Sequence, residues 1–308
     1  MDIEAPVVAA RARIAAQLVG RDRELELVLA AVDAGRDLVL EGPPGTSKTT
    51  ILRAITADWG IPLLFVEGNA DLTPSKLVGH HNPARVLRED YRPENFVPGP
   101  LVEAMQTGGF LYIEEFNRAP EDTLNTLLTA MGDRQLTVAR VGTIEAAPSF
   151  RVIASMNPID DIGTARLSTS VLDRLCRLSI GYQDAAAEAA IVSLRTAGNA
   201  GSPGATLGAG LVGDVVAVTR ATRVHRDVRQ GSSVRGAIDC NLVVGRLCML
   251  RGIETAQGDD YDRALLDGML VALSGRIHLD EAAQATPEQI LLEIWQEHLL
   301  LRQAAEPG

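Results

Sequence analysis

The stretch "RDLVLEGPPGTSKTTILRAITADWG", residues 36–60, joins an apolar run, a glycine-rich turn and a helical pattern. It is close to G-x-x-x-x-G-K-[ST], the pattern of a phosphate-binding loop. Gly42 opens the pattern, Lys48 and Thr49 close it, and Ser47 stands where glycine usually precedes the lysine. A strand that turns into a helix points backbone N–H groups and the positive helix end at an anion. The stretch therefore predicts a nucleotide site on a parallel α/β sheet.

The loop residues have distinct predicted roles. Lys48 would reach the terminal phosphates, and the Thr49 hydroxyl would hold Mg²⁺. Ser47 keeps a backbone N–H, and it would cost strain of about 1 kcal/mol if its φ is positive and little if its φ is helical. The residues expected to contact ATP in this loop are Gly42, Pro43, Pro44, Gly45, Thr46, Ser47, Lys48, Thr49 and Thr50.

A second apolar run, "FLYIEE" at 110–115, ends on two carboxylates. Parallel sheets place ligands at the carboxyl ends of their strands, so this pair is expected beside the loop. Glu114 is the predicted Mg²⁺ ligand, in a position where P-loop enzymes normally have aspartate. Its extra methylene would shift the carboxylate by about 1.5 Å. Glu115 is the predicted base, and the alternative for both is a solvated strand end.

Composition narrows the class of protein. The 308 residues are 46% hydrophobic and only 4% aromatic, which suits helices packed on a parallel sheet. A formal charge of −11 repels nucleic acid phosphates, which argues against nucleic acid binding as the main activity. No run approaches 18 uncharged apolar residues and no signal peptide is visible, so we expect no membrane span and a cytoplasmic protein.

The chain is expected to form two domains. An α/β nucleotide-binding core spans residues 1–182, with a polar connection at about 69–100 and a hairpin at about 135–147; a helical domain spans 183–308. The pair His80-His81 is expected in a surface loop, and the glycine-rich segment 197–210 is expected to be a flexible loop. The basic run 219–230 is read as a helix. Its face would either be solvated or contact nucleotide or a neighbouring subunit.

The run "GGFLYIEEFNRAPEDTLNTLLTAMGDRQLTV", residues 108–138, resembles the MoxR group of AAA+ ATPases, close to the magnesium-chelatase ATPase subunit. Downstream, "FRVIASMNPIDDIGTARLSTSVLDRL" looks like the sensor-1 strand and arginine-finger region of that group. Upstream, "LVGRDREL" looks like its adenine-side segment, which contains Gly20. "DLTPSKLVGHHNPARVL" and "FVPGPL" look like its helix-2 insert. The resemblance covers residues from about 17 to 240.

The resemblance implies roles for further residues. Asn157 matches sensor 1, which positions the attacking water. Arg174 matches the arginine finger given to a neighbour's site, with Arg166 as the reserve candidate. Arg235 matches the sensor-2 arginine, in cis or in trans. Each also has a simpler interpretation: a turn residue for Asn157, an ion pair with Asp173 for Arg174, and a solvated side chain for Arg235.

The resemblance also implies an architecture and an activity. The fold would be an AAA+ P-loop NTPase core with a parallel sheet, followed by a small all-helical C-terminal lid. The activity would be Mg²⁺-dependent ATP hydrolysis in a homo-oligomeric, hexameric ring that remodels a client protein, with a von Willebrand factor A-domain partner. The alternative, motivated by Ser47 and Glu114, is a nucleotide-gated switch with little turnover. A nucleic-acid motor is a more distant third.

Overall fold

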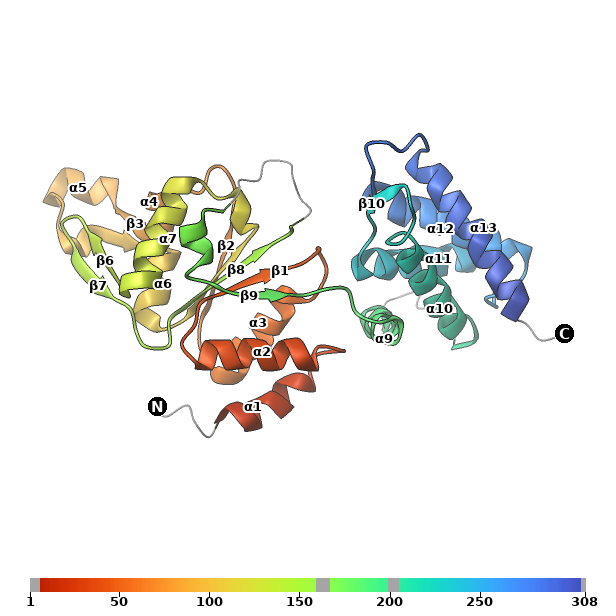
Figure 1. Cartoon of the computed structure of the whole chain (residues 1–308), viewed down its shortest axis with the longest axis horizontal. Helices are drawn as coiled ribbons and strands as arrows, with labels where there is room; N and C mark the ends of the chain where they lie inside the picture. The colour runs from red at the N-terminus through yellow and green to blue at the C-terminus, as the bar shows by residue number, and fades with distance from the viewer. Residues whose placement is uncertain (1–5, 159–166, 199–204, 306–308) are drawn as a thin grey trace. The chain divides into compact units, whose positions relative to one another are not determined.

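The computed structural model describes residues 6–158, 167–198 and 205–305 (Figure 1). The chain divides into two compact units, residues 1–181 and 182–308. Each unit is described by itself. Among the helices of the described residues, none is both long enough and apolar enough to cross a membrane.

The first unit is built on a five-stranded sheet in which all strand pairs are parallel. Its order is β2-β5-β8-β1-β9, and the strands are β2 Leu63–Glu67, β5 Phe110–Glu114, β8 Arg151–Met156, β1 Leu38–Glu41 and β9 Cys176–Ser179. The three inner strands are almost entirely buried, as expected when helices cover both faces of a parallel sheet. This confirms the predicted α/β class. It also brings the carboxyl ends of β5, β8 and β1 to one edge.

Helices cover the two faces of this sheet. One face packs against α1 Pro6–Ala15, α2 Asp22–Asp33 and α3 Lys48–Trp59. The other packs against α6 Pro100–Thr107, α7 Glu121–Asp133 and α8 Thr169–Leu172. Alternate residues of each strand supply the two cores. In β1, Leu38 and Leu40 belong to the α3 side and Val39 to the α7 side.

The polar connection of residues 69–100 contains regular structure. It holds α4 Pro74–Val78, β3 Gly79–His81, α5 Pro83–Glu89, η1 Pro93–Asn95 and β4 Phe96–Pro98, with β3 and β4 antiparallel. The expectation of a surface loop for the histidine pair is therefore wrong. His81 lies on β3, and its ring contacts those of Tyr91 and Phe96 at centroid distances of 5.3 and 5.5 Å.

A hairpin follows α7 in the chain. It consists of β6 Gln135–Val138 and β7 Gly142–Glu145. Near its turn, the Arg140 guanidinium lies 4.5 Å from the centroid of the Tyr91 ring. The hairpin and the polar connection of residues 69–100, called the insert below, therefore contact each other through this cation–π pair.

The second unit is helical. It contains α9 Ala185–Thr196, α10 Ala205–Ala221, α11 Val234–Arg251, α12 Asp259–Leu273, η3 Ser274–Arg276 and α13 Pro287–Ala305, with a short ribbon of β10 Val228–Gln230 and β11 His278–Leu279. The flexible loop expected over 197–210 is wrong from Ala205, where α10 begins. Residues 199–204 lie outside the description.

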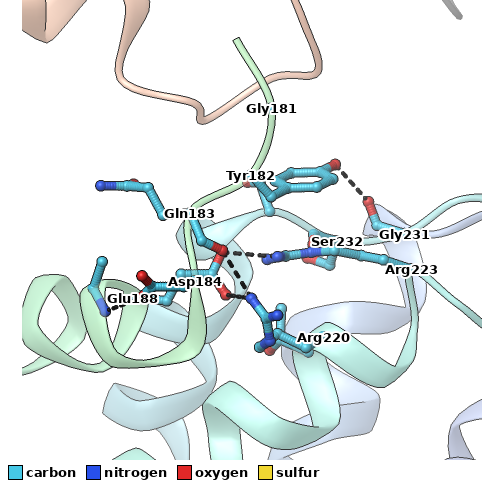
Figure 2. A network of polar contacts seen from close by, with 12 residues as sticks. Gly181, Tyr182, Gln183, Asp184, Glu188, Arg220, Arg223, Gly231 and Ser232 are labelled. Carbon is cyan, nitrogen blue, oxygen red and sulfur yellow. Dashed lines mark hydrogen bonds and ion pairs between the residues drawn. The ribbon is translucent and has the colours of Figure 1, made fainter. Parts of the chain in front are cut away.

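The basic run 219–230 does not form the predicted helical face, because α10 ends at Ala221. Instead, Arg220 and Arg223 turn inward onto the carboxylate of Glu188, at 3.2 and 2.8 Å (Figure 2). Glu188 is 2% exposed, and the Arg223 guanidinium also lies 3.9 Å from the Tyr182 ring centroid. A buried carboxylate needs such partners to offset its lost hydration. Both arginines are thus ion-paired within the helical unit, with the Arg223 side chain 9% exposed and the Arg220 side chain 38% exposed.

Candidate nucleotide site

Three neighbouring strands end at the predicted site. β1 runs into Gly42, β8 into Asn157 and β5 into Glu115. The Gly42 N–H donates to the carbonyl of Met156 at 3.1 Å, so the glycine-rich loop starts directly beside the end of β8. A Cβ at Gly42 would overlap the carbonyl oxygen of Ile180, so a side chain has no room there. Glycine at this position lets the loop leave the sheet next to β9.

The loop curls around its own lysine. Lys48 opens α3, and its Nζ donates to the carbonyls of Gly42 and Pro43 at 2.8 and 2.9 Å. Thr46 Oγ1 donates to the Pro43 carbonyl at 2.9 Å, which tightens the turn. Left-handed residues in such turns form backbone concavities that bind anions. The loop therefore joins an ammonium group, a helix N-terminus and a concave run of backbone in one place.

Ser47 has the positive-φ conformation that carries a cost. Its φ and ψ are 67° and 15°, in the left-handed region, directly before the first residue of α3. Of the two alternatives left open by the sequence, the strained one is therefore observed. A residue with a Cβ costs about 1–2 kcal/mol in this region, whereas glycine does not.

Replacing Ser47 with glycine is expected to stabilise the first unit by about 0.5–1 kcal/mol. Relief of left-handed strain exceeds the extra entropy of glycine in the unfolded chain, which is about 0.5–1 kcal/mol. Urea denaturation measures the difference. Ser47→Ala keeps the strain and should not stabilise, and Ser75→Gly, within helix α4, should destabilise. Loss of stability in Ser47→Gly would contradict the strain argument.

The Thr49 hydroxyl and the Glu114 carboxylate lie close together. Thr49 Oγ1 is 3.5 Å from Glu114 Oε1. Both are hard oxygen ligands of the kind that Mg²⁺ prefers, and Mg²⁺ usually keeps several waters, which tolerates a longer acid. These two groups fit the cation that the loop would need. Sequence reasoning missed their neighbour Tyr112, whose hydroxyl is 3.2 Å from Thr49 Oγ1.

Tyr112 lies within the buried strand β5. Its side chain is fully buried, and its hydroxyl also donates to Ser155 Oγ on β8 at 2.9 Å. Burial raises the pKa of this hydroxyl, while its bonds to Ser155 and Thr49 act in the opposite direction. The signal that could have found it is general, since a tyrosine in an apolar strand requires a partner for its hydroxyl.

Glu115 sits on a sharp turn at the end of β5. Its φ is 53°, and η2 Phe116–Arg118 begins immediately after it. The backbone there is constrained, because the Gly68 N–H donates to the Glu114 carbonyl at 2.7 Å and a Cβ at Gly68 would meet the Glu115 carbonyl. Glu115 Oε2 lies 3.1 Å from Arg118 Nη1, and the Glu115 side chain is 40% exposed. The carboxylate is thus accessible and held by an arginine.

Asn157 lies at the carboxyl end of the inner strand β8, whereas Arg174 lies before the amino end of the outer strand β9. Asn157 directly follows β8 and is half-buried. Arg174 lies in the turn between α8 and β9, the edge strand, where its Nη1 donates to the Ser170 carbonyl at 3.0 Å. The reserve candidate Arg166 lies outside the described residues. The structure brings Asn157, and not Arg174, to the loop of its own chain.

Another arginine does reach the loop. Arg177 on β9 forms an ion pair with Glu41, the residue that precedes Gly42. The Glu41 side chain is 6% exposed. Sequence reasoning missed this pair because the two residues are 136 positions apart. The contact ties the start of the loop to the edge strand.

Gly20 lies in the first unit and Arg235 in the second. Gly20 has a φ of 60° in the turn between α1 and α2. The next residue, Arg21, is 3% exposed and donates to the carbonyl of Gly181 at 2.7 Å. Arg235 is an exposed residue of the first turn of α11 in the second unit, and its backbone N–H donates to Ser233 Oγ at 3.3 Å.

Comparison with known proteins agrees with this geometry. Residues 37–175 match the model of an AAA domain of the dynein-related subfamily. The gas vesicle ATPase GvpN of Ancylobacter aquaticus is 27% identical over 279 residues, covering 85% of this chain and 73% of GvpN. The MoxR protein of Methylorubrum extorquens is 32% identical over 170 residues, covering 55% of this chain. The chain spans about half, 47%, of MoxR.

Solved structures share the fold. The Thermotoga maritima RuvB branch migration motor matches with a TM-score of 0.52 and 16% identity, covering 82% of this chain and 70% of RuvB. A crystal structure from Cytophaga hutchinsonii matches with a TM-score of 0.50 and 21% identity, covering 95% of this chain and 96% of that one. At these identities the likeness concerns the fold alone.

Strand order, loop sequence and relatives lead to one assignment. The sheet order and the helical C-terminal region are those expected of the AAA+ fold. The matched domain covers β1 to the end of α8 and its following turn, and so includes the loop, the acidic pair and Asn157. Residues 37–175 match an AAA domain of the dynein-related subfamily, and the chain is an AAA+ ATPase similar to MoxR and GvpN.

Proposed function

We propose that this ATPase holds Mg²⁺-ATP at the carboxyl edge of β1, β8 and β5 and hydrolyses it. The observation that carries the proposal is the convergence of the Lys48 loop with the Thr49–Glu114 oxygen pair, 3.5 Å apart. Lys48 and the loop N–H groups would bind the phosphates, with residues Gly42 to Thr50 lining them. Thr49 and Glu114 would hold the cation, which when bound neutralises charge on the phosphates.

The remaining site residues are proposed to act on water and on developing charge. Glu115 would accept a proton from, and orient, the attacking water, while Asn157 beside it would position that water. Arg174 would stabilise charge in the site of a neighbouring subunit. Gly20 would lie on the adenine side, and Arg235 would contact nucleotide in cis or in trans. A site completed by another chain's arginine requires a closed ring, for which a homohexamer is our proposal.

The output is proposed to be mechanical work on a protein client. The insert of residues 69–100 and the hairpin of residues 135–147 contact each other through Arg140 and Tyr91, so the two would move together. MoxR and GvpN are the named relatives. We propose that this chain remodels a client protein in the cytoplasm together with a von Willebrand factor A-domain partner. The net charge of −11 favours a protein client over nucleic acid.

Replacing Lys48 with alanine tests the nucleotide site. Removing one partner of a charged contact with phosphate costs about 2–5 kcal/mol, so ATP affinity should fall roughly 30-fold or more. Calorimetry measures it. The chain has only two lysines, and Lys76→Ala on the exposed side of α4 is the matched control. Equal ATP affinity in Lys48→Ala and wild type would overturn the site. Tight ATP binding by wild type without phosphate release would favour the nucleotide-gated switch.

A further inference from the structure

Tyr112 connects three parts of the nucleotide site through one hydroxyl group. It lies on β5, two residues before Glu114, and its hydroxyl donates to Ser155 Oγ on β8 at 2.9 Å. Thr49 Oγ1 on α3 is 3.2 Å from the same hydroxyl. Tyr112 is fully buried and Ser155 is 1% exposed, so water does not compete for the bond between them.

The direction of these bonds constrains the Thr49 proton. Since the Tyr112 proton points to Ser155, its oxygen is left as an acceptor facing Thr49. A hydroxyl has one proton and two lone pairs. If Thr49 donates its proton to Tyr112, neither lone pair of Thr49 is used in that bond, so both can serve as ligands of a cation. The other acceptor within reach of that proton, Glu114 Oε1, is 3.5 Å from Thr49 Oγ1, so the Tyr112 hydroxyl at 3.2 Å is the nearer of the two.

We propose that Tyr112 is a positioning residue that accepts the Thr49 proton and so presents the Thr49 lone pairs to Mg²⁺. This rests on the proposed role of Thr49 as a cation ligand. Tyr112 does not touch the cation or the nucleotide in this scheme. It acts by fixing the rotation of one hydroxyl, and Ser155 acts one step further away by taking the tyrosine proton.

Replacing Tyr112 with phenylalanine is expected to weaken only the magnesium-dependent part of ATP binding. The ring stays in place, and the hydroxyl's bonds to Ser155 and Thr49 are both lost. The bond to Thr49 is the one that bears on Mg²⁺, and a hydrogen bond worth about 0.5–1.5 kcal/mol corresponds to roughly a three- to tenfold change. Calorimetry of ATP binding with Mg²⁺ and with EDTA gives the gain in affinity due to Mg²⁺. We expect that gain to fall three- to tenfold, with ATP affinity in EDTA unchanged. A merely structural tyrosine would lower both affinities.

A double-mutant cycle with Thr49→Ala makes the test specific. Once the threonine hydroxyl is gone, Tyr112→Phe should have no further effect on the magnesium gain. Ser155→Ala leaves the tyrosine ring and hydroxyl intact and should give a smaller loss in the same direction. Thermal denaturation checks that each variant is folded.

The outcomes separate the two proposals. Two results would overturn the role of Tyr112 alone. The first is a Tyr112→Phe variant with the full wild-type gain in affinity due to Mg²⁺. The second is a Tyr112→Phe substitution that lowers this gain by the same factor in wild type and in Thr49→Ala. A wild-type chain whose ATP affinity does not depend on Mg²⁺, or a Thr49→Ala variant with the full gain, overturns the metal role of Thr49 and with it the inference.

Discussion

Subunits carrying Arg174→Ala are expected to inhibit wild-type subunits when the two are mixed. Arg174 lies in the exposed turn before the edge strand β9, where its guanidinium donates to the Ser170 carbonyl and lies against Gly132 of α7. It is thus available to a neighbour, and not to its own loop at the ends of β1, β8 and β5. An arginine that stabilises a transferring phosphoryl group contributes about 10³–10⁵ in rate.

The mixing experiment separates an arginine acting in trans from one acting in cis. Phosphate release is measured at a fixed total concentration while the wild-type fraction is varied. If each Arg174→Ala subunit silences its neighbour's site, activity falls more steeply than the wild-type fraction. Arg263→Ala is the matched control, because Arg263 is 72% exposed and pairs only weakly with Asp260 on the same helix. Activity that simply follows the wild-type fraction would show that Arg174 is not a trans finger.

The features that the sequence predicted depend on local patterns. Apolar runs followed by glycine or by paired acids predict strands, because a buried parallel strand needs apolar residues on both faces. The start of α13 shows interactions of similarly short range, because the Thr286 N–H donates to Gln289 Oε1 at 2.8 Å and the Gln289 N–H to Thr286 Oγ1 at 3.3 Å. Such capping boxes involve residues three positions apart. Short-range rules of this kind fixed the elements and their order.

The features that were missed depend on partners far apart in the chain. The sequence predicts Tyr112 as a core residue of an apolar strand. No neighbouring residue indicates that its hydroxyl contacts Thr49, 63 positions upstream. From the sequence, Arg220 and Arg223 are expected on a basic helix face that is either solvated or in contact with nucleotide or a neighbouring subunit. Their carboxylate partner Glu188 stands 32 residues before Arg220 in an alanine-rich helix. Pairing of polar groups across a fold depends on tertiary packing, which a single sequence does not display.

The conformation of Ser47 shows an intermediate case. The sequence identified the residue and the two possible costs, but the choice between them depended on φ, which the loop sets as a whole. Ser47, with a φ of 67°, has a counterpart in Glu115, the predicted base on the other side of the site, whose φ is 53°. Two non-glycine residues in the left-handed region flank the site, and such strain persists only where the surrounding structure imposes it.

Replacing Glu115 with glutamine is expected to lower ATP turnover by about 10²–10⁴, the contribution of a general base, with ATP binding unchanged. Glutamine keeps the shape of the side chain and the turn at the end of β5, but it cannot accept the proton of the attacking water. The carboxylate of Glu115 is 40% exposed and lies 3.1 Å from Arg118, so it can reach a water at this edge of the sheet. Phosphate release under saturating Mg²⁺-ATP measures the rate, and calorimetry measures binding.

Glu121→Gln provides the control for this substitution. Glu121 is an exposed acid in the first turn of α7, a few residues beyond Glu115, and its loss should leave turnover within twofold. Turnover of Glu115→Gln close to that of wild type would assign the base to another group at the same edge. If wild type itself releases no phosphate while binding ATP tightly, the strained turns at Ser47 and Glu115 would belong to a switch. Slow wild-type turnover that Glu115→Gln abolishes would instead identify a hydrolase whose rate this carboxylate sets.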